Sequence, residues 1–137
     1  ECHGLPNFAN QDYKIIGVPD VKDPAKYDGD VGRGAISKDA GYNFAFKIPT
    51  LRNIEKTGPY MHNGIYRTLE EVMDFYAKGG GHELMVPNLD DKIRKFDLSM
   101  SDRADLVAFM KSLTDESLTP EIPAQVPSGL PVLRSFK

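Results

Sequence analysis

The chain has 137 residues, of which 40% are hydrophobic and 27% are charged, as expected for a globular domain. Its net charge of −3 is mild and its Lys and Arg residues are scattered, which argues against a nucleic-acid partner. No apolar run approaches the roughly 20 residues that a membrane-spanning helix needs. The single cysteine excludes a disulfide within the chain.

Regular structure is sparse in the first half of the chain, where Pro and Gly residues mark long connections. Residues 13–18 and 45–48 are short candidate strands, and a short helix is predicted after Pro49 through Ile54. The stretch 17–44 exceeds the roughly 15 residues that structureless loops rarely pass in a compact domain. A loop of that length indicates a site that it serves.

The clearest helix follows Thr68, which forms a capping-box pattern with Glu71 three residues later. Gly79 is expected to end it, so the segment GGGHE (79–83) is predicted to be a helix stop and a turn. Helical spacing places four residues on the apolar face of this helix: Leu69, Val72, Met73 and Tyr76.

A second helix is predicted within residues 99–113, where either Ser99 or Ser101 can cap the first turn. Asp102 suits the positive end of the helix dipole. The apolar stripe predicted for this helix consists of Leu106, Phe109, Met110 and Leu113.

These elements predict an all-α fold class with long loops. Residues 1–118 are predicted to form one folded domain, and residues 119–137 an extended, Pro-rich C-terminal tail. Two helices provide a thin core for a chain of this length. A large apolar prosthetic group would supply the missing core.

The chain opens with Glu1-Cys2-His3-Gly4, the second half of a Cys-x-x-Cys-His motif. In the full motif two thiols bind the haem vinyl groups and the histidine becomes an axial ligand of the iron. Cys2 would then form a thioether and His3 would bind the iron. A chance Cys-His pair explains half a motif equally well. If the motif is real, either residues precede Glu1 or a single thioether holds the haem.

A much longer pattern supports the haem interpretation. The run AFKIPTLRNIEKTGPYMHNGIYRTLEEVMDFYAKGG (45–80) closely resembles the C-terminal haem domain of the bacterial dihaem cytochrome c peroxidase and MauG family. The flanking segments FANQDYKIIGVPD, DVGRGAISKD, LSMSDRADLVAFMKSLT and PSGLPV also resemble that family. The resemblance covers essentially the whole chain, and it implies a cytochrome c-like fold with covalently bound haem c.

The resemblance also implies a sixth iron ligand. Peroxidases of the family use a methionine near the end of the helix after the P-Y-x-H-x-G loop, and MauG-like members use a tyrosine, which corresponds to Tyr76. A phenolate favours Fe(III), so Tyr76 predicts a low-potential haem. Met61 is the rival, because it lies 58 residues after His3, near the spacing of small monohaem cytochromes. The full set of candidate donors is Met61, His62, Tyr76, His82, Met85 and Met100.

Other residues have two interpretations each. Tyr76 either binds the iron or is an aromatic residue on the core-facing side of its helix. His62 either bonds a haem propionate or a water, or braces its turn. Arg52 either pairs with a propionate or lies in solvent. The family binds calcium between its two haem domains through backbone carbonyls near T-x-P, which implies Thr57 and Pro59 here, together with a ligand from the other domain.

The resemblance implies an electron-transfer haem domain that supplies or stores electrons for a peroxide-reacting haem in an N-terminal domain. No catalytic residue is assigned to this chain itself. The implied partners are that domain, in the same or a separate chain, and a redox protein donor or protein substrate; a homodimer is also compatible. The implied location is the periplasm. A stand-alone monohaem cytochrome c and a haem-free domain are the alternatives.

Overall fold

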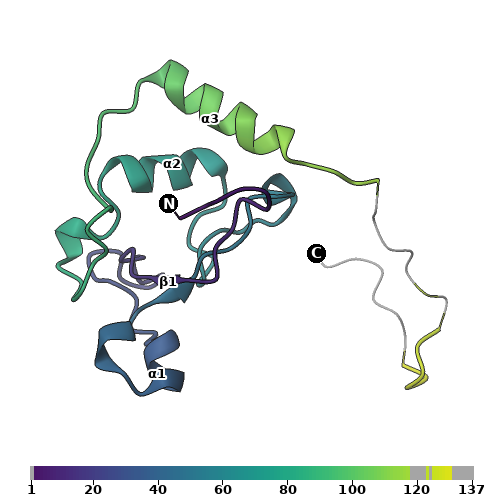
Figure 1. The fold of residues 1–137 in the computed structure, drawn as a ribbon, viewed down its shortest axis with the longest axis horizontal. Coiled ribbons are helices and arrows are strands. Elements are labelled where there is room, and N and C mark those ends of the chain that lie inside the picture. The colour runs from purple at the N-terminus through teal and green to yellow at the C-terminus, as the bar shows by residue number, and fades with distance from the viewer. Residues whose placement is uncertain (1, 118–122, 124, 131–137) are drawn as a thin grey trace.

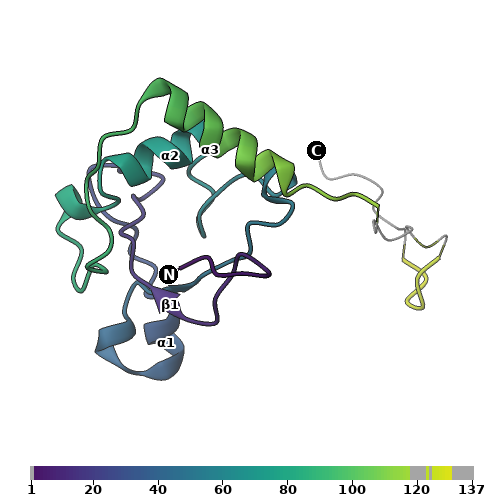
Figure 2. The ribbon, with the colours of Figure 1, turned by 45° about the horizontal axis from the view of Figure 1, so that its top comes forward.

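The computed structural model describes residues 2–117, 123 and 125–130, and most of the predicted tail 119–137 lies outside the described residues (Figure 1). Helices α2 and α3 lie together at one end of the ribbon, α1 lies at the opposite end, and β1 lies between them (Figure 1, Figure 2). In chain order the elements are β1 (Tyr13–Lys14), α1 (Arg33–Ser37), β2 (Phe46–Lys47), α2 (Leu69–Ala77) and α3 (Met100–Ser112), with 3-10 turns at Ala40–Tyr42, Ile54–Lys56 and His82–Leu84.

The predicted all-α class is wrong. The two candidate strand segments pair in an antiparallel two-stranded sheet, with Tyr13 opposite Lys47 and Lys14 opposite Phe46. The three α-helices have only 5, 9 and 13 residues, and much of the remaining described chain is turn and loop. The helix predicted after Pro49 is reduced to the 3-10 turn Ile54–Lys56.

Helix α2 forms where the sequence predicts it. The Thr68 hydroxyl accepts a hydrogen bond from the Glu71 backbone N–H, and the Glu71 carboxylate accepts one from the Thr68 backbone N–H. This capping box is confirmed, and it satisfies backbone donors that the first turn leaves without partners. The helix buries Leu69, Val72 and Phe75.

Helix α3 begins after Ser99, whose hydroxyl accepts a hydrogen bond from the Asp102 backbone N–H. Its buried face shares Met110 with the predicted stripe but is otherwise rotated from it. Val107 and Met110 are buried and pack with Leu69 of α2, whereas Leu106 is 41% exposed and Phe109 is 45% exposed. The rotation follows from the position of α2, which the spacing of apolar residues in α3 alone does not specify.

The hydrophobic core is divided into small clusters. One joins α2 and α3, and a second consists of Ile15, Ala45 and Val86. Among the described residues no large side chain is less than 2% exposed. Protein interiors normally pack side chains densely, so this chain retains little apolar packing of its own. In the part of the chain that the structure describes, the buried hydrophobic residues are Ile15, Val18, Ala45, Ile48, Leu69, Val72, Phe75, Val86, Val107 and Met110.

The glycines after α2 allow two backbone segments to approach closely. The Gly81 N–H donates to the carbonyl oxygen of Ile16 at 2.9 Å. A Cβ atom on Gly81 would overlap the Cα and carbonyl atoms of Gly17. The predicted stop and turn at residues 79–83 is therefore also a packing contact with the segment after β1.

We predict that Gly81→Ala lowers the free energy of unfolding by about 1–3 kcal/mol, because backbone atoms must move to admit the methyl group. Urea denaturation measures the change. Gly29→Ala is the matched control, since no atom lies within 4 Å of its Cβ position. Equal effects of the two substitutions would contradict the packing argument.

Lys14 of β1 forms an ion pair with Asp90, with 2.8 Å between Nζ and Oδ2. The side chains are 31% and 11% exposed, respectively. The hydrogen bond from Lys14 is the main reason that the pKa of Asp90 is lowered, and burial of the carboxyl group opposes this shift. The Asp90 backbone N–H also donates to the Ile15 carbonyl at 3.0 Å, so the pair fixes the loop after Leu84 to the small sheet.

The lowered pKa of Asp90 means that the folded state favours its carboxylate. This contribution to stability is present above the ordinary aspartate pKa of about 4 and is lost as pH falls through the lower folded-state value. Asp90→Asn should lower the free energy of unfolding at neutral pH by about 1 kcal/mol and should weaken its acid dependence. Urea denaturation at neutral and acidic pH tests this, with the exposed neighbour Asp91→Asn as control. An unchanged acid dependence in Asp90→Asn would contradict it.

Candidate functional site

His3 is held in a fixed orientation by two backbone carbonyls. Its Nδ1 atom lies 3.1 Å from the Phe8 oxygen and 3.1 Å from the Pro49 oxygen. A carbonyl only accepts hydrogen bonds, so Nδ1 carries a proton, and in the neutral ring Nε2 then keeps its lone pair. Metal-binding histidines commonly donate their second ring N–H to a carbonyl in this way. Nε2 of His3 is therefore prepared to bind a metal.

The loop before β1 is attached to residues 49–52 by further hydrogen bonds. Thr50 Oγ1 donates to the Asn7 carbonyl at 2.6 Å, and the Leu51 N–H donates to the Phe8 carbonyl at 3.2 Å. Arg52 Nη2 donates to the Pro6 carbonyl at 2.6 Å, with its guanidinium 5.7 Å from the Phe8 ring centre. The propionate role predicted for Arg52 stays a prediction, and its observed contact is with the loop that follows His3.

Tyr76 lies near the end of α2, with its ring 5.3 Å from that of Phe75. Burial, with a smaller contribution from Cys2, raises the pKa of Tyr76 to about 12. The phenol is therefore protonated at neutral pH, and its electrostatic interaction with Cys2 places it in the neighbourhood of the chain's only thiol. The effect of Cys2 on the pKa of Tyr76 indicates that three predicted haem-binding residues lie in one region of the fold: Cys2, His3 and Tyr76.

The other predicted sixth ligands are placed differently. Met85 is 86% exposed and Met100 is 82% exposed, and His82 is also exposed. Met61 is half-buried in a turn, with a φ of 67°. Its carbonyl accepts a hydrogen bond from the Gly64 N–H at 3.3 Å.

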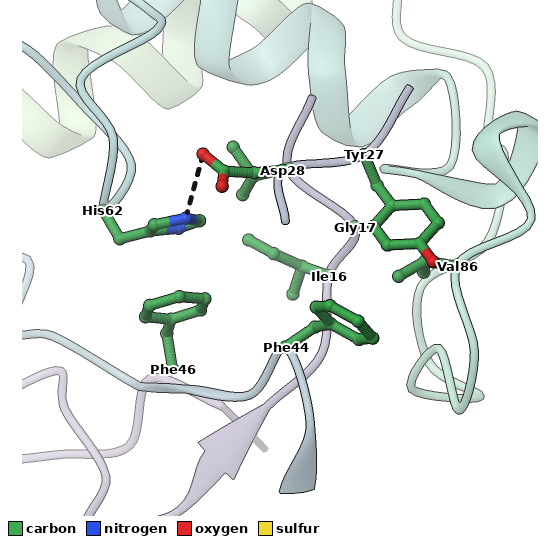
Figure 3. A pocket seen from close by; sticks show the side chains of 9 residues that line it. Ile16, Gly17, Tyr27, Asp28, Phe44, Phe46, His62 and Val86 are labelled. Carbon is green, nitrogen blue, oxygen red and sulfur yellow. Dashed lines mark ion pairs between the residues drawn. The ribbon is translucent and has the colours of Figure 1, made fainter. Parts of the chain in front are cut away.

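His62 lies against Phe46, with ring centres 3.6 Å apart and planes inclined by 9°. Its Nε2 lies 3.5 Å from Asp28 Oδ2, and the side chain is 16% exposed (Figure 3). Burial lowers the pKa of His62, although Asp28 and Asp30 oppose the shift. A backbone hydrogen bond from Asp30 lowers the pKa of Asp28. At neutral pH the pair is thus a neutral imidazole beside a carboxylate.

Asn63 connects the loop that carries Met61 and His62 to two other loops. Its Nδ2 donates to Asp28 Oδ2 at 2.7 Å and to the Pro19 carbonyl at 2.8 Å. Its Oδ1 accepts from the Ile65 N–H at 3.2 Å. Sequence reasoning missed Asn63 and Asp28, because partners 35 residues apart leave no local pattern.

A small pocket lies beside this contact (Figure 3). His62 and Asp28 contribute its polar side chains, and aromatic and aliphatic groups supply most of the rest. Its lining residues are Ile16, Gly17, Val18, Tyr27, Asp28, Phe44, Phe46, His62 and Val86.

Thr57 and Pro59, the predicted calcium residues, are exposed, and the Gly58–Pro59 peptide bond is cis. Thr57 Oγ1 donates to the Ile54 carbonyl at 3.1 Å. Among the described residues, no group of three or more His, Cys, Asp or Glu residues could hold a metal ion. Calcium at this position stays a prediction.

The residues near the start of the chain fit a c-type haem. Cys2 is a free thiol, and His3 is oriented with an available Nε2. Tyr76 supplies a half-buried phenol whose pKa is influenced by Cys2. The small core clusters provide little apolar packing, so a bound apolar group would add to the core. A planar, largely apolar group with an iron atom would suit these donors and would add apolar packing.

Comparison with known proteins supports the same conclusion. No protein-family model matches the chain. It is 35% identical to methylamine utilization protein MauG of Methylorubrum extorquens over 124 residues, covering 89% of this chain and 32% of that protein. It is 41% identical to cytochrome-c peroxidase IdrP2 of Pseudomonas sp. over 113 residues, covering 82% and 28%, respectively.

A solved structure of a MauG-like protein associated with microbial copper homeostasis matches with a TM-score of 0.70 and 35% identity. The match covers 85% of this chain and 39% of that one. The chain belongs to the bacterial dihaem cytochrome c peroxidase and MauG family. It corresponds to the C-terminal part of these haem oxidoreductases, and the cytochrome c-like relation is supported although the all-α class is not.

The chain spans about a third of the length of the curated relatives it matches, with 32% of the Methylorubrum MauG covered. The relatives are therefore substantially larger than this polypeptide. Among the described residues, no helix is both long and apolar enough to cross a membrane.

Proposed function

We propose that this chain is the electron-transfer c-type haem domain of a dihaem peroxidase or MauG-like oxidoreductase. The observation that carries the proposal is the orientation of His3, whose Nδ1 is held at 3.1 Å by two carbonyls next to the thiol of Cys2. Cys2 would bind the haem covalently, and His3 Nε2 would bind the iron. When bound, the haem supplies a centre that accepts and releases one electron at a time.

Tyr76 is the proposed sixth ligand. Its phenol is half-buried, and its raised pKa keeps the proton on oxygen at neutral pH, so the phenol would lose this proton on binding iron. A phenolate is a hard anionic donor that stabilises ferric iron and lowers the reduction potential. Electrostatic interaction with Cys2 and a place on the rigid α2 helix support Tyr76 over the exposed Met85 and Met100.

The activity of the whole protein would require a second haem in an N-terminal domain, in the same or a separate chain. The larger size of the relatives supports this arrangement. The assembled protein would reduce hydrogen peroxide or, with Tyr76 as ligand, oxidise a partner protein, and a redox protein would supply electrons. We place it in the periplasm, with calcium bound between the domains by the carbonyls of Thr57 and Pro59.

The haem count of the native protein tests the domain proposal. We expect the intact mass, measured on protein from cells with a cytochrome c maturation system, to show covalent haem that remains after acid-acetone extraction. Two haems on a longer polypeptide would support the dihaem enzyme, whereas one haem on this chain alone would support the monohaem carrier. Cys2→Ala should reduce covalent attachment to this domain, and a protein without covalent haem would contradict the proposal.

Substitution of the tyrosine tests the sixth ligand. Tyr76→Phe removes the phenol oxygen but keeps the ring against Phe75. We expect the ferric haem to lose its tyrosinate absorption and resonance Raman signals and to change spin state. Tyr66→Phe is the matched control, since Tyr66 is another partly buried tyrosine in contact with Phe75. A spectrum unchanged by Tyr76→Phe would reject the assignment.

A further inference from the structure

The loop that carries Met61 is anchored on both sides of that residue. Before it, the Tyr60 N–H donates to the Tyr66 carbonyl at 2.7 Å, and the Tyr60 hydroxyl donates to the Ile54 carbonyl at 3.1 Å. After it, the ring of His62 is stacked on Phe46 at 3.6 Å (Figure 3). The backbone of Met61 is therefore fixed by its neighbours.

A further anchor is the Asn63–Asp28 clamp, by which we mean the hydrogen-bonded side chains of these two residues. Asn63 Nδ2 donates to Asp28 Oδ2 at 2.7 Å and to the Pro19 carbonyl at 2.8 Å. Asp28 is in turn held by the Asp30 N–H, which donates to Oδ1 at 2.8 Å. The Asp28 backbone N–H donates to the Val18 carbonyl at 2.8 Å. Hydrogen bonds to a carboxylate are stronger than those between neutral groups, so the clamp resists opening.

A tyrosine-ligated haem has to exclude competing thioethers. Sulfur donors suit the softer ferrous iron, so a free methionine competes with Tyr76 whenever the haem is reduced. Met85 and Met100 are exposed, Met110 is buried in the core, and Met73 packs against that same cluster. Met61 remains as the half-buried methionine in a loop rather than in a helix or core cluster.

We propose that the Asn63–Asp28 clamp is a positioning device that selects the sixth ligand: it holds Met61 away from the iron and leaves that coordination site to Tyr76. The inference rests on the proposed function, because it requires a haem attached through Cys2. The clamp touches neither ligand directly. It acts through the backbone of residues 61–63, so its loss should change the identity of the ligand rather than the attachment of the haem.

The test is carried out in the Tyr76→Phe background, where the coordination site is open to a replacement. With the clamp intact, we expect the haem of Tyr76→Phe to lack a thioether ligand. With Asn63→Ala added, we expect Met61 to bind, which gives a low-spin ferrous haem, a sulfur-to-iron charge-transfer band in the near infrared, and a higher reduction potential. Met61→Leu added to this double variant should abolish the new band.

Two further variants control for general loosening and for misfolding. Asp20→Ala removes the acceptor of the Lys22 and Asp23 N–H groups in the neighbouring loop but does not touch Asn63, so it should leave the Tyr76→Phe spectrum unchanged. Asp28→Asn keeps the side-chain volume but removes the negative charge and leaves one acceptor oxygen for the two donors, Asn63 Nδ2 and the Asp30 N–H. It should reproduce the effect of Asn63→Ala if that variant folds poorly.

Two results would overturn the clamp proposal. One is a thioether spectrum in Tyr76→Phe with the clamp intact, which would show that Met61 is free to bind. The other is a spectrum unchanged by both Asn63→Ala and Asp28→Asn in folded protein. Both results are read on haem-loaded protein, whereas failure of the proposed function would appear earlier, as an absence of covalent haem in the unmodified chain.

Discussion

Two carbonyl oxygens, those of Phe8 and Pro49, fix the imidazole of His3 at 3.1 Å each, and the arrangement of the proposed haem site depends on this contact. Here residues 49–52 bond the N-terminal loop through Thr50, Leu51 and Arg52. As a result, Cys2 and His3 belong to an ordered loop, and one ring nitrogen of His3 is left available for iron.

The structure relies on polar contacts between loops as much as on apolar packing. Its core consists of small clusters, and no large side chain among the described residues is fully buried. Asp28, Asn63 and the Lys14–Asp90 pair connect loops that a larger core would otherwise hold. Such contacts fix direction as well as distance, because a hydrogen bond weakens steeply when its angle departs from linearity. This precision suits a domain whose loops would surround a rigid prosthetic group.

The proposed haem would give these contacts a common role. A haem that transfers electrons needs its ligands fixed, since ligand identity sets its reduction potential. His3 is oriented by carbonyls, and Tyr76 is carried by a helix whose first turn is capped by Thr68 and Glu71. The loop with Met61 and His62 is fixed by Asn63 and Phe46. His3, Tyr76 and the loop with Met61 thus each have their own support.

The sequence by itself determined the features that depend on neighbours a few residues apart. These include the capping box of α2, a serine cap at the start of α3 and the stop at Gly79. The haem interpretation of Cys2 and His3 came from family resemblance and stays a prediction. Only the tertiary structure decided the pairing of β1 with β2, the rotated face of α3, and the partners of His3 and Asn63. Pro49 lies 46 residues from His3, and Asp28 lies 35 residues from Asn63. Every residue has a carbonyl that can accept a hydrogen bond, so a long-range contact of this kind leaves no periodic signal in the chain.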